Sequence, residues 1–316
     1  MRRPFAIPAV LAGLLLALIG AAAPSAAAGT DEKLPVPYTF FPDALVGAVP
    51  PGGSAPGSND WSCTPSRKHP RPVVLVHGTF GSRATNWQTY APLLHNKGYC
   101  VFALTYGQLP TPDPATQELG GMARMEDSAR ELKRFVRKVL RRTGAQKVYI
   151  VGHSQGTLMP NWYVKFLGGA RHVRNYVSLA PLWHGTAVTR PAEVASVLLG
   201  EDAATPVCEA CGQFAPGSAF MRKMRAGGVA VSGIRYTNIV TRYDQLVVPY
   251  SSGIEEGMTN HVVQDHCATD FSEHFEIAAD PVAAALVLNA LDRRNARPVP
   301  CELVLPLTGT PAPPAG

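Results

Sequence analysis

A single serine lies between two glycines in the segment Lys147–Pro160, which reads KVYIVGHSQGTLMP. The letters GHSQG match the pattern G-x-S-x-G, with Ser154 at the centre. In that pattern a tight turn between a strand and a helix holds the serine hydroxyl above a sheet, where it can attack a carbonyl carbon. Val148–Val151 predicts the strand, and the residues after the serine predict the helix. An ordinary strand–helix turn is the alternative, but the flanking elements favour a nucleophile.

A serine nucleophile needs a general base, and the base needs a carboxylate that orients its ring. After such a turn the acid and then the base come later in the chain, in loops that follow further strands. Asp244 directly follows the strand predicted within GIRYTNIVTRYD, so we expect it to be the acid rather than a simple turn aspartate. His274 lies where a loop enters the last predicted helix, and we expect it to be the base. His266 is the second choice, and His261 begins an apolar stretch that resembles a strand.

The oxygen that becomes negative during such an attack needs hydrogen-bond donors. One expected donor is the backbone N–H of Gln155, which follows the serine. The other is expected in the turn HGTFG, where Gly78 allows close backbone approach, from Thr79 or else Phe80. No metal site and no cofactor are expected, because no histidine and carboxylate cluster has metal-ligand spacing and no glycine-rich phosphate loop is present.

Several aromatic and histidine side chains accompany these motifs in the sequence. Four aromatic side chains could line an acyl pocket or belong to the core: Phe80, Trp87, Trp162 and Trp183. For Trp162, which lies on a predicted helix, the core is favoured. Three histidines are expected to pack beside the site rather than act in it: His77, His153 and His184.

The elements that must position these residues alternate between strands and helices. Val73–Val76 is a continuous apolar run ended by a glycine, typical of a strand buried on both faces. Further strands are predicted within CVFALTYG, KVYIVG, RNYVSLAP and GIRYTNIVTRYD. Between the first two of these four, apolar residues at helical spacing run from Leu132 to Leu140, with arginine and lysine on the other face. The alternation predicts an α/β fold with a mostly parallel central sheet flanked by helices.

The first 28 residues predict a cleaved signal peptide, and therefore a secreted protein. Arg2 and Arg3 precede an apolar run that is too short to span a bilayer, which argues against a membrane anchor. Ala26 and Ala28 supply a small-residue cleavage site.

Composition divides the rest of the 316-residue chain. Residues 29–60 are rich in proline and glycine and predict an extended arm, 61–305 are expected to form the catalytic domain, and 306–316 a flexible tail. Residues 187–228 interrupt the alternation and are expected to be an inserted cap. The formal charge of +6 includes two charges from the signal, and the remaining basic residues are scattered, so no nucleic-acid partner is expected. We expect a monomer without stable membrane insertion.

An even number of cysteines in an exported chain favours disulfide bonds. The six are Cys63, Cys100, Cys208, Cys211, Cys267 and Cys301. The pair in CEAC, Cys208 and Cys211, is expected to close a small loop rather than to bind zinc or act as a redox pair. The other four allow three pairings, among which we expect Cys63–Cys100 and Cys267–Cys301.

With these residues in view, the chain resembles the secreted lipases of actinobacteria, of the Streptomyces type, which are α/β-hydrolases acting on acylglycerols. The segments that carry the resemblance are HPRPVVLVHGTFG, GYCVFALTYGQLP, VGHSQGTLMPNWYVKFLGGA, LAPLWHGT, RYTNIVTRYDQLVVPY and DFSEHFEIA. The resemblance implies the same nucleophile, acid, base and oxyanion donors as the motifs do, and it supports the two longer disulfides. The cysteine pair in TPVCEACGQF departs from the family pattern.

The expected function is therefore that of a triacylglycerol lipase that acts on acylglycerols or other esters, in part at a lipid–water interface. A carboxylesterase for short acyl groups or a polyester hydrolase is the alternative within enzymes. A non-catalytic secreted binding protein is the alternative from another class, because fold alone does not fix function.

Overall fold

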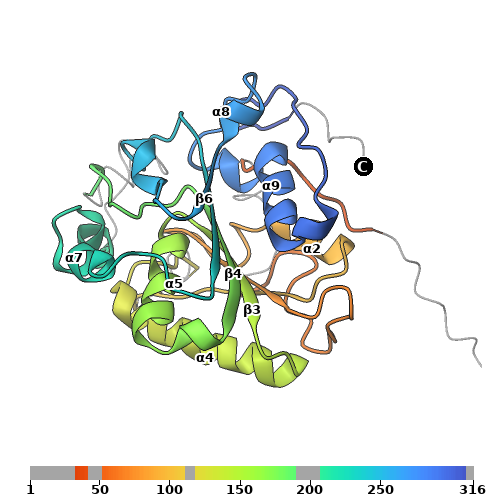
Figure 1. Ribbon diagram of the computed structural model, residues 1–316, viewed down its shortest axis with the longest axis horizontal. Coiled ribbons are helices and arrows are strands. Elements are labelled where there is room, and N and C mark those ends of the chain that lie inside the picture. The colour runs from red at the N-terminus through yellow and green to blue at the C-terminus, as the bar shows by residue number, and fades with distance from the viewer. Residues whose placement is uncertain (1–32, 42–51, 111–117, 190–206, 311–316) are drawn as a thin grey trace, which may run out of the picture. The chain divides into compact units, whose positions relative to one another are not determined.

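The computed structural model describes residues 33–41, 52–110, 118–189 and 207–310. A parallel sheet with the strand order β2-β1-β3-β4-β5-β6 forms its centre (Figure 1). The strands are β1 (Val73–Val76), β2 (Val101–Leu104), β3 (Val148–His153), β4 (Val173–Leu179), β5 (Arg235–Val240) and β6 (Thr259–Val262). The predicted fold class, a mostly parallel sheet flanked by helices, is confirmed.

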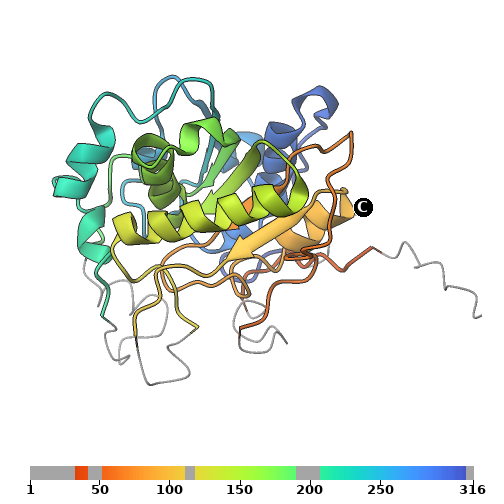
Figure 2. The same cartoon turned by 90° about the horizontal axis from the view of Figure 1, so that it is seen from below.

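Helices cover both faces of this sheet (Figures 1 and 2). They are α2 (Tyr90–Asn96), α4 (Met125–Thr143), α5 (Gln155–Phe166), α7 (Ala219–Arg225), α8 (Val263–His266) and α9 (Pro281–Leu291). Alternate residues of each central strand enter different cores: Val74 packs in the core that contains α4 and α5, and Leu75 in the core that contains α2 and α9. This double burial explains why the strand sequences are apolar throughout. No helix in the described part of the chain is both long enough and apolar enough to cross a membrane.

Local sequence accounts for the longest helix on each face of the sheet, α4 on one and α9 on the other. The first turn of α4 carries Glu126 and Asp127, its last turn carries Arg141 and Arg142, and it ends at Gly144 with a φ of 68°. These charges complement the helix dipole, and a glycine readily takes the left-handed conformation that stops a helix. The α9 helix begins after Asp280, whose side chain accepts hydrogen bonds from the first turn.

The N-terminal arm runs beside α2 and the C-terminal segment. Asn96 exchanges two hydrogen bonds with the backbone of Leu34, at 2.9 and 2.8 Å. The Thr310 N–H donates to the carbonyl of Tyr38 at 3.2 Å. This bond ties Thr310, which lies in the stretch 306–316 predicted as a tail, to the N-terminal arm. Residues 311–316 and the predicted signal peptide lie outside the described residues.

The expected cap, residues 187–228, is described only at its two ends, since residues 190–206 lie outside the described part. Its second end contains α7, whose Phe220 stacks on Trp162 of α5 with ring centroids 4.9 Å apart. Of residues 207–228, Phe214 alone lines the pocket beside Ser154. The described end of this insertion thus packs mainly against the α5 side of the sheet.

The structure brings the cysteines together in three pairs. The sulfur atoms lie 2.02 Å apart in Cys63–Cys100, 2.03 Å in Cys208–Cys211 and 2.08 Å in Cys267–Cys301. The first pair joins the segment before β1 to the start of β2, and the last joins the end of α8 to the C-terminal segment. Both of these bonds connect parts of the chain that are more than 30 residues apart.

Candidate active site

Ser154 lies at the tight turn between β3 and α5, at the carboxyl end of the sheet. Its backbone has φ 55° and ψ −126°, a conformation that costs a non-glycine residue on the order of 1–3 kcal/mol. The turn also forces backbones into close contact, because a Cβ atom at Gly156 would lie 2.0 Å from the carbonyl oxygen of Val76. A Cβ atom at Gly152 would lie 2.0 Å from the carbonyl oxygen of Gly156. Both glycines of the sequence motif are therefore needed for this geometry.

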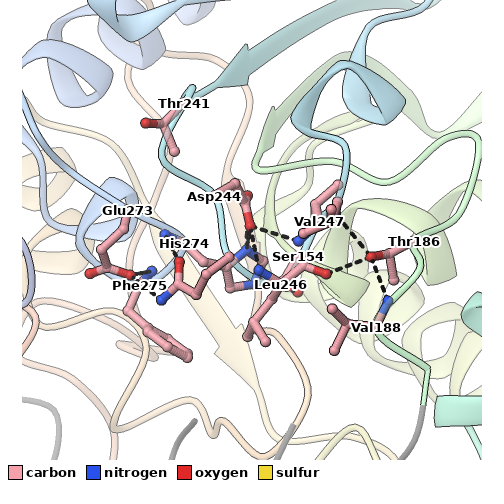
Figure 3. A network of polar contacts seen from close by, with 12 residues as sticks. Ser154, Thr186, Val188, Thr241, Asp244, Leu246, Val247, Glu273, His274 and Phe275 are labelled. Carbon is pink, nitrogen blue, oxygen red and sulfur yellow. Dashed lines mark hydrogen bonds and ion pairs between the residues drawn. The ribbon is translucent and has the colours of Figure 1, made fainter. Parts of the chain in front are cut away.

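The structure brings Ser154, His274 and Asp244 into one hydrogen-bonded chain (Figure 3). The Nε2 atom of His274 lies 2.9 Å from Oγ of Ser154. Its Nδ1 atom lies 2.8 and 3.0 Å from the two carboxylate oxygens of Asp244. With the Nδ1 proton donated to the carboxylate, Nε2 is free to accept the serine proton. The side chains of His274 and Asp244 are each 2% exposed, so the chain is shielded from water apart from its serine end.

The two loops that carry the acid and the base are held together by further bonds. Oδ1 of Asp244 also accepts from the backbone N–H groups of Leu246 and Val247, at 2.9 and 2.7 Å. Gln245 accepts from the N–H of His274 at 3.1 Å and donates to Glu273 at 2.9 Å. These contacts fix the Asp244 carboxylate and the His274 backbone independently of the bond between them. Sequence reasoning missed Gln245 and Glu273, whose only signal was their position next to the expected acid and base.

His153 is hydrogen-bonded to the backbone of the loop that carries His274. Its Nε2 atom lies 2.7 Å from the carbonyl oxygen of His274, and its Nδ1 atom lies 3.1 Å from Oδ1 of Asn86. Burial, together with the nearby His274, lowers the pKa of His153 to about 3. His153 is therefore neutral at physiological pH, and its role is to position a loop.

His77 and His184 take part in other contacts. The ring of His77 stacks on Tyr106 with centroids 4.3 Å apart, and burial lowers its pKa to about 4. His184 lies 2.9 Å from a carboxylate oxygen of Glu255. Neither ring is hydrogen-bonded to Ser154, in line with the expectation that these histidines pack beside the site.

Two backbone N–H groups next to Ser154 have no hydrogen-bond acceptor among the described residues: those of Thr79 and Gln155. The Thr79 turn lies directly against the serine, since a Cβ atom at Gly78 would be 3.1 Å from the Cβ of Ser154. The Thr79 hydroxyl donates to Oε1 of Gln155 at 2.7 Å and so joins the two candidate donor residues. Both could donate to an oxygen that becomes negative at Ser154.

The third expected donor, Phe80, differs from the other two. Its backbone N–H donates to the carbonyl oxygen of Gly120 at 2.8 Å, so this amide is already occupied. Its φ is 60°, in the left-handed region of the backbone map. We therefore correct the expectation for Phe80: its side chain lines the pocket, but its N–H is not available as an oxyanion donor.

A mainly apolar cavity of about 160 Å³ adjoins Ser154 and His274. Its apolar lining includes Phe40, Phe41, Phe80, Leu182, Phe214, Leu246 and Phe275. Two of these come from the N-terminal arm and pack on Phe275, with ring centroids 5.9 Å away for Phe40 and 5.6 Å for Phe41. Their sequence position, far from every motif, gave no sign of this role.

The tryptophans considered for the pocket lie elsewhere. Trp87 and Trp183 are fully buried, and Trp162 packs with Phe220 in the core that contains α4 and α5. None of the three lines the cavity beside Ser154. The arrangement can thus hold an apolar group next to a serine, a histidine that can act as base, and two N–H donors. Within the described ranges no three side chains of the types histidine, cysteine, aspartate and glutamate come together as metal ligands.

The chain is similar to one protein family and, in fold, to two solved lipase structures. The family described as lipase (class 2) matches residues 70–287. Lipase B of Aspergillus fumigatus superposes with a TM-score of 0.55 at 20% identity, over 78% of this chain and 57% of that one. The mature form of lipase BlEst2 of Bacillus licheniformis gives 0.52 at 16% identity, over 76% of this chain and 96% of that one. At such identities the two structures show a shared fold, and the chain spans little more than half of the first.

Proposed function

The chain belongs to the class 2 lipase family and has the α/β-hydrolase fold; we propose that it is an ester hydrolase, namely a secreted triacylglycerol lipase with Ser154 as its nucleophile. The observation that carries the proposal is the bonded chain from Ser154 through His274 to Asp244, with its 2.9 and 2.8 Å contacts. Three disulfide pairs support secretion, because such bonds persist in oxidising compartments.

The proposed reaction begins when Oγ of Ser154 attacks the ester carbonyl carbon as Nε2 of His274 takes the hydroxyl proton. Asp244 stabilises the imidazolium that forms. The carbonyl oxygen becomes negative and accepts hydrogen bonds from the N–H groups of Thr79 and Gln155, next to the positive end of the α5 dipole. His274 then gives its proton to the leaving alcohol, and the acyl group remains on Ser154.

Water completes the cycle. His274 takes a proton from the water molecule, whose oxygen attacks the acyl carbon, and the second tetrahedral intermediate is held by the same two N–H donors. The bond to Oγ of Ser154 breaks, the serine recovers its proton from His274, and a carboxylic acid leaves. During both halves the acyl chain lies against the aromatic wall formed by Phe40, Phe41 and Phe275.

An exposed apolar surface beside the pocket supports a water-insoluble substrate. We call it the apolar ridge, and its exposed fractions are Tyr243 45%, Phe271 37%, Leu303 46%, Leu305 41% and Leu307 44%. A backbone bridge between Asp270 and Val304 buries those two residues and turns their neighbours outward. The rings of Tyr243 and Phe271 lie 5.5 Å apart, which extends the ridge on one side.

The ridge reaches the pocket mouth through the N-terminal arm. The N–H of Phe41, which lines the cavity, donates to the carbonyl oxygen of Leu307 at 3.3 Å. An exposed apolar surface that is continuous with a binding pocket is typical of a contact with lipid or protein. We take it as support for a lipid substrate rather than a small soluble ester.

A fluorophosphonate probe tests the nucleophile directly, because it reacts with an activated serine hydroxyl. We expect the probe to label the wild-type protein and to leave Ser154→Ala unlabelled. The matched control is Ser251→Ala, which removes an exposed hydroxyl outside the site and should be labelled like the wild type. Equal labelling of Ser154→Ala and wild type would show that Ser154 is not the nucleophile.

A carboxylesterase for short acyl groups is the second candidate, and the small cavity of about 160 Å³ favours it. Hydrolysis rates on p-nitrophenyl esters of increasing chain length distinguish the two functions. A lipase should retain activity on esters of long chains. Activity confined to acetate and butyrate esters would favour the esterase.

A further inference from the structure

A second groove lies away from Ser154 and is lined by residues of α2 and α9. These two helices lie on the same face of the sheet (Figure 1). The volume of the groove is about 320 Å³. Leu93 and Lys97 from the end of α2 form one wall, and Ala284 and Leu288 of α9 form the other. None of the residues of the proposed catalytic chain lines it.

The floor of this groove is apolar. Leu93 and Ala284 are buried to all but 7% and 2% of their surface, and Leu288 is half-buried against the same core. Tyr38 of the N-terminal arm also lines it. Such a surface suits a hydrocarbon chain, since each CH₂ group removed from water contributes about 0.8 kcal/mol.

Positive charges surround the apolar floor. Lys68, Lys97 and Arg297 line the groove, and none of them forms an ion pair with a carboxylate of the described residues. Burial lowers the pKa of Lys97, and the charges of Arg297, Lys33 and Lys68 lower it further. These cations repel one another, and an anion placed among them would relieve the repulsion.

Asp292 also lines the groove and brings one negative charge to it, against the three positive charges of Lys68, Lys97 and Arg297. Its carboxylate accepts a hydrogen bond from the neutral amide of Asn295 at 2.8 Å, which leaves that charge in place. The lining therefore keeps an excess of positive charge.

The cationic rim is held by the fold. Asn289 of α9 exchanges two hydrogen bonds with the backbone of Arg297, both at 2.8 Å. Lys97 directly follows α2, and its N–H donates to carbonyl groups of that helix. The two charged residues thus stand on backbones whose positions are fixed before any ligand arrives.

We propose that this groove is a second binding site, for a free fatty acid: the alkyl chain lies along Leu93, Ala284 and Leu288, and the carboxylate faces Lys97 and Arg297. The class of ligand rests on the proposed function, because a carboxylic acid with an alkyl chain is what hydrolysis at Ser154 releases. The groove would hold this product outside the catalytic pocket.

Protection of Lys97 from chemical acetylation locates the site without any need for hydrolysis. The full chain is treated with an N-hydroxysuccinimide acetate at pH 8, with and without dodecanoate, and acetylation of each lysine is followed by mass spectrometry. We expect dodecanoate to protect Lys97 at least threefold and to leave Lys138, on α4, unprotected. Methyl dodecanoate, which lacks the charge, should protect Lys97 less. Equal acetylation of Lys97 with and without dodecanoate would overturn the proposal.

Calorimetric titration with dodecanoate supplies the second measurement. We expect Lys97→Gln/Arg297→Gln to bind dodecanoate on the order of tenfold more weakly than wild type at low salt. The matched control Arg141→Gln/Arg142→Gln removes two exposed charges of α4 and should bind like wild type. Equal affinity of both double variants would contradict a site at Lys97 and Arg297.

Phosphatidylglycerol vesicles separate a free fatty acid from an anionic membrane surface. If vesicles protect Lys97 and free dodecanoate does not, the groove is a membrane contact and the fatty-acid proposal is wrong. If the fluorophosphonate does not label the protein but dodecanoate still protects Lys97, the proposed function is wrong and the second binding site stands.

Discussion

The Asp244 carboxylate accepts hydrogen bonds from the His274 ring and from two backbone N–H groups. In Asp244→Asn an amide must face these donors, so the histidine loses the partner that fixes its Nδ1 proton and stabilises its charged form. We expect kcat on p-nitrophenyl butyrate to fall by about 10³–10⁴-fold, with KM changed little. Steady-state kinetics of the purified variant measures both constants.

A matched control for this variant is Asp265→Asn. Asp265 is an exposed acid paired with Arg242, outside the pocket, so its replacement should leave kcat within twofold of wild type. A loss of less than tenfold in Asp244→Asn would show that the bond seen at 2.8 Å does not orient the base.

His153 makes the stability of the protein depend on pH. Its pKa is about 3 in the folded protein, whereas an unfolded histidine has a pKa near 6.5. Below pH 6.5 the unfolded chain therefore binds a proton that the folded protein does not, and the free energy of unfolding falls as the pH falls toward 3. Relative to His153→Gln, the wild type should lose about 1.4 kcal/mol per pH unit between pH 6 and pH 4.

Urea denaturation of both proteins at pH 7, 6, 5 and 4 tests this effect. His77→Gln should show the same trend with the same sign, because burial holds the folded pKa of His77 at about 4. A difference between variant and wild type that stays constant over this pH range would contradict the buried neutral state of these rings.

Which site residues could be predicted depended on whether their signal is local. Ser154 has a motif, and Asp244 and His274 follow it in the order and at the loop positions that a strand–turn–helix nucleophile requires. Gln245 and Phe40 carry no such pattern. The Phe40 N–H donates to Glu276, 236 residues away, so its place at the pocket follows only from the packing of the arm.

At the scale of elements, the strand–turn–helix around Ser154 depends on backbone contact without side chains. A Cβ atom at Gly156 would meet the carbonyl oxygens of Val76 and His77 at 2.0 and 2.5 Å, and neither can move without shifting β1. We therefore expect Gly156→Ala to lower the free energy of unfolding by about 3 kcal/mol or more. Urea denaturation followed by circular dichroism measures the loss.

Gly217→Ala is the control for this substitution. It adds the same methyl group where nothing lies within 4 Å of the new Cβ, and should change stability by no more than about 0.5 kcal/mol. Similar stability of both variants would mean that β1 and α5 do not approach as closely as the structure shows.

Some strands and helices could be predicted from the sequence and others could not. The strands β1 and β3 could be read from the sequence because both of their faces are buried, which makes them apolar throughout. The stretch NHVVQD resembled one strand, yet β6 ends at Val262 and α8 begins at Val263. Each has four residues, too few for a periodic signal, and the change is fixed by Gln264, which donates to Thr241 and to the backbone of Asp270.

At the scale of the whole molecule, the apolar ridge is joined to the pocket lining where Phe41 donates a hydrogen bond to Leu307. Fully burying a leucine side chain contributes about 1.5–3 kcal/mol, so each ridge leucine, a little under half exposed, should contribute about 1 kcal/mol to adsorption on lipid. Leu303→Ser/Leu305→Ser/Leu307→Ser removes about 3 kcal/mol in all and should therefore weaken adsorption to a triglyceride surface on the order of a hundredfold. Hydrolysis of emulsified trioctanoin should fall with it.

The soluble ester p-nitrophenyl acetate separates adsorption from chemistry, since it reaches Ser154 without any surface. The triple variant should hydrolyse it within twofold of wild type, because the three side chains lie outside the cavity. Phe166→Ser/Val207→Ser, which removes exposed apolar side chains away from the ridge, should lose neither activity. Unchanged emulsion activity in the triple variant would show that the substrate reaches the pocket without contact between the ridge and lipid, and would favour the soluble short-chain ester as substrate.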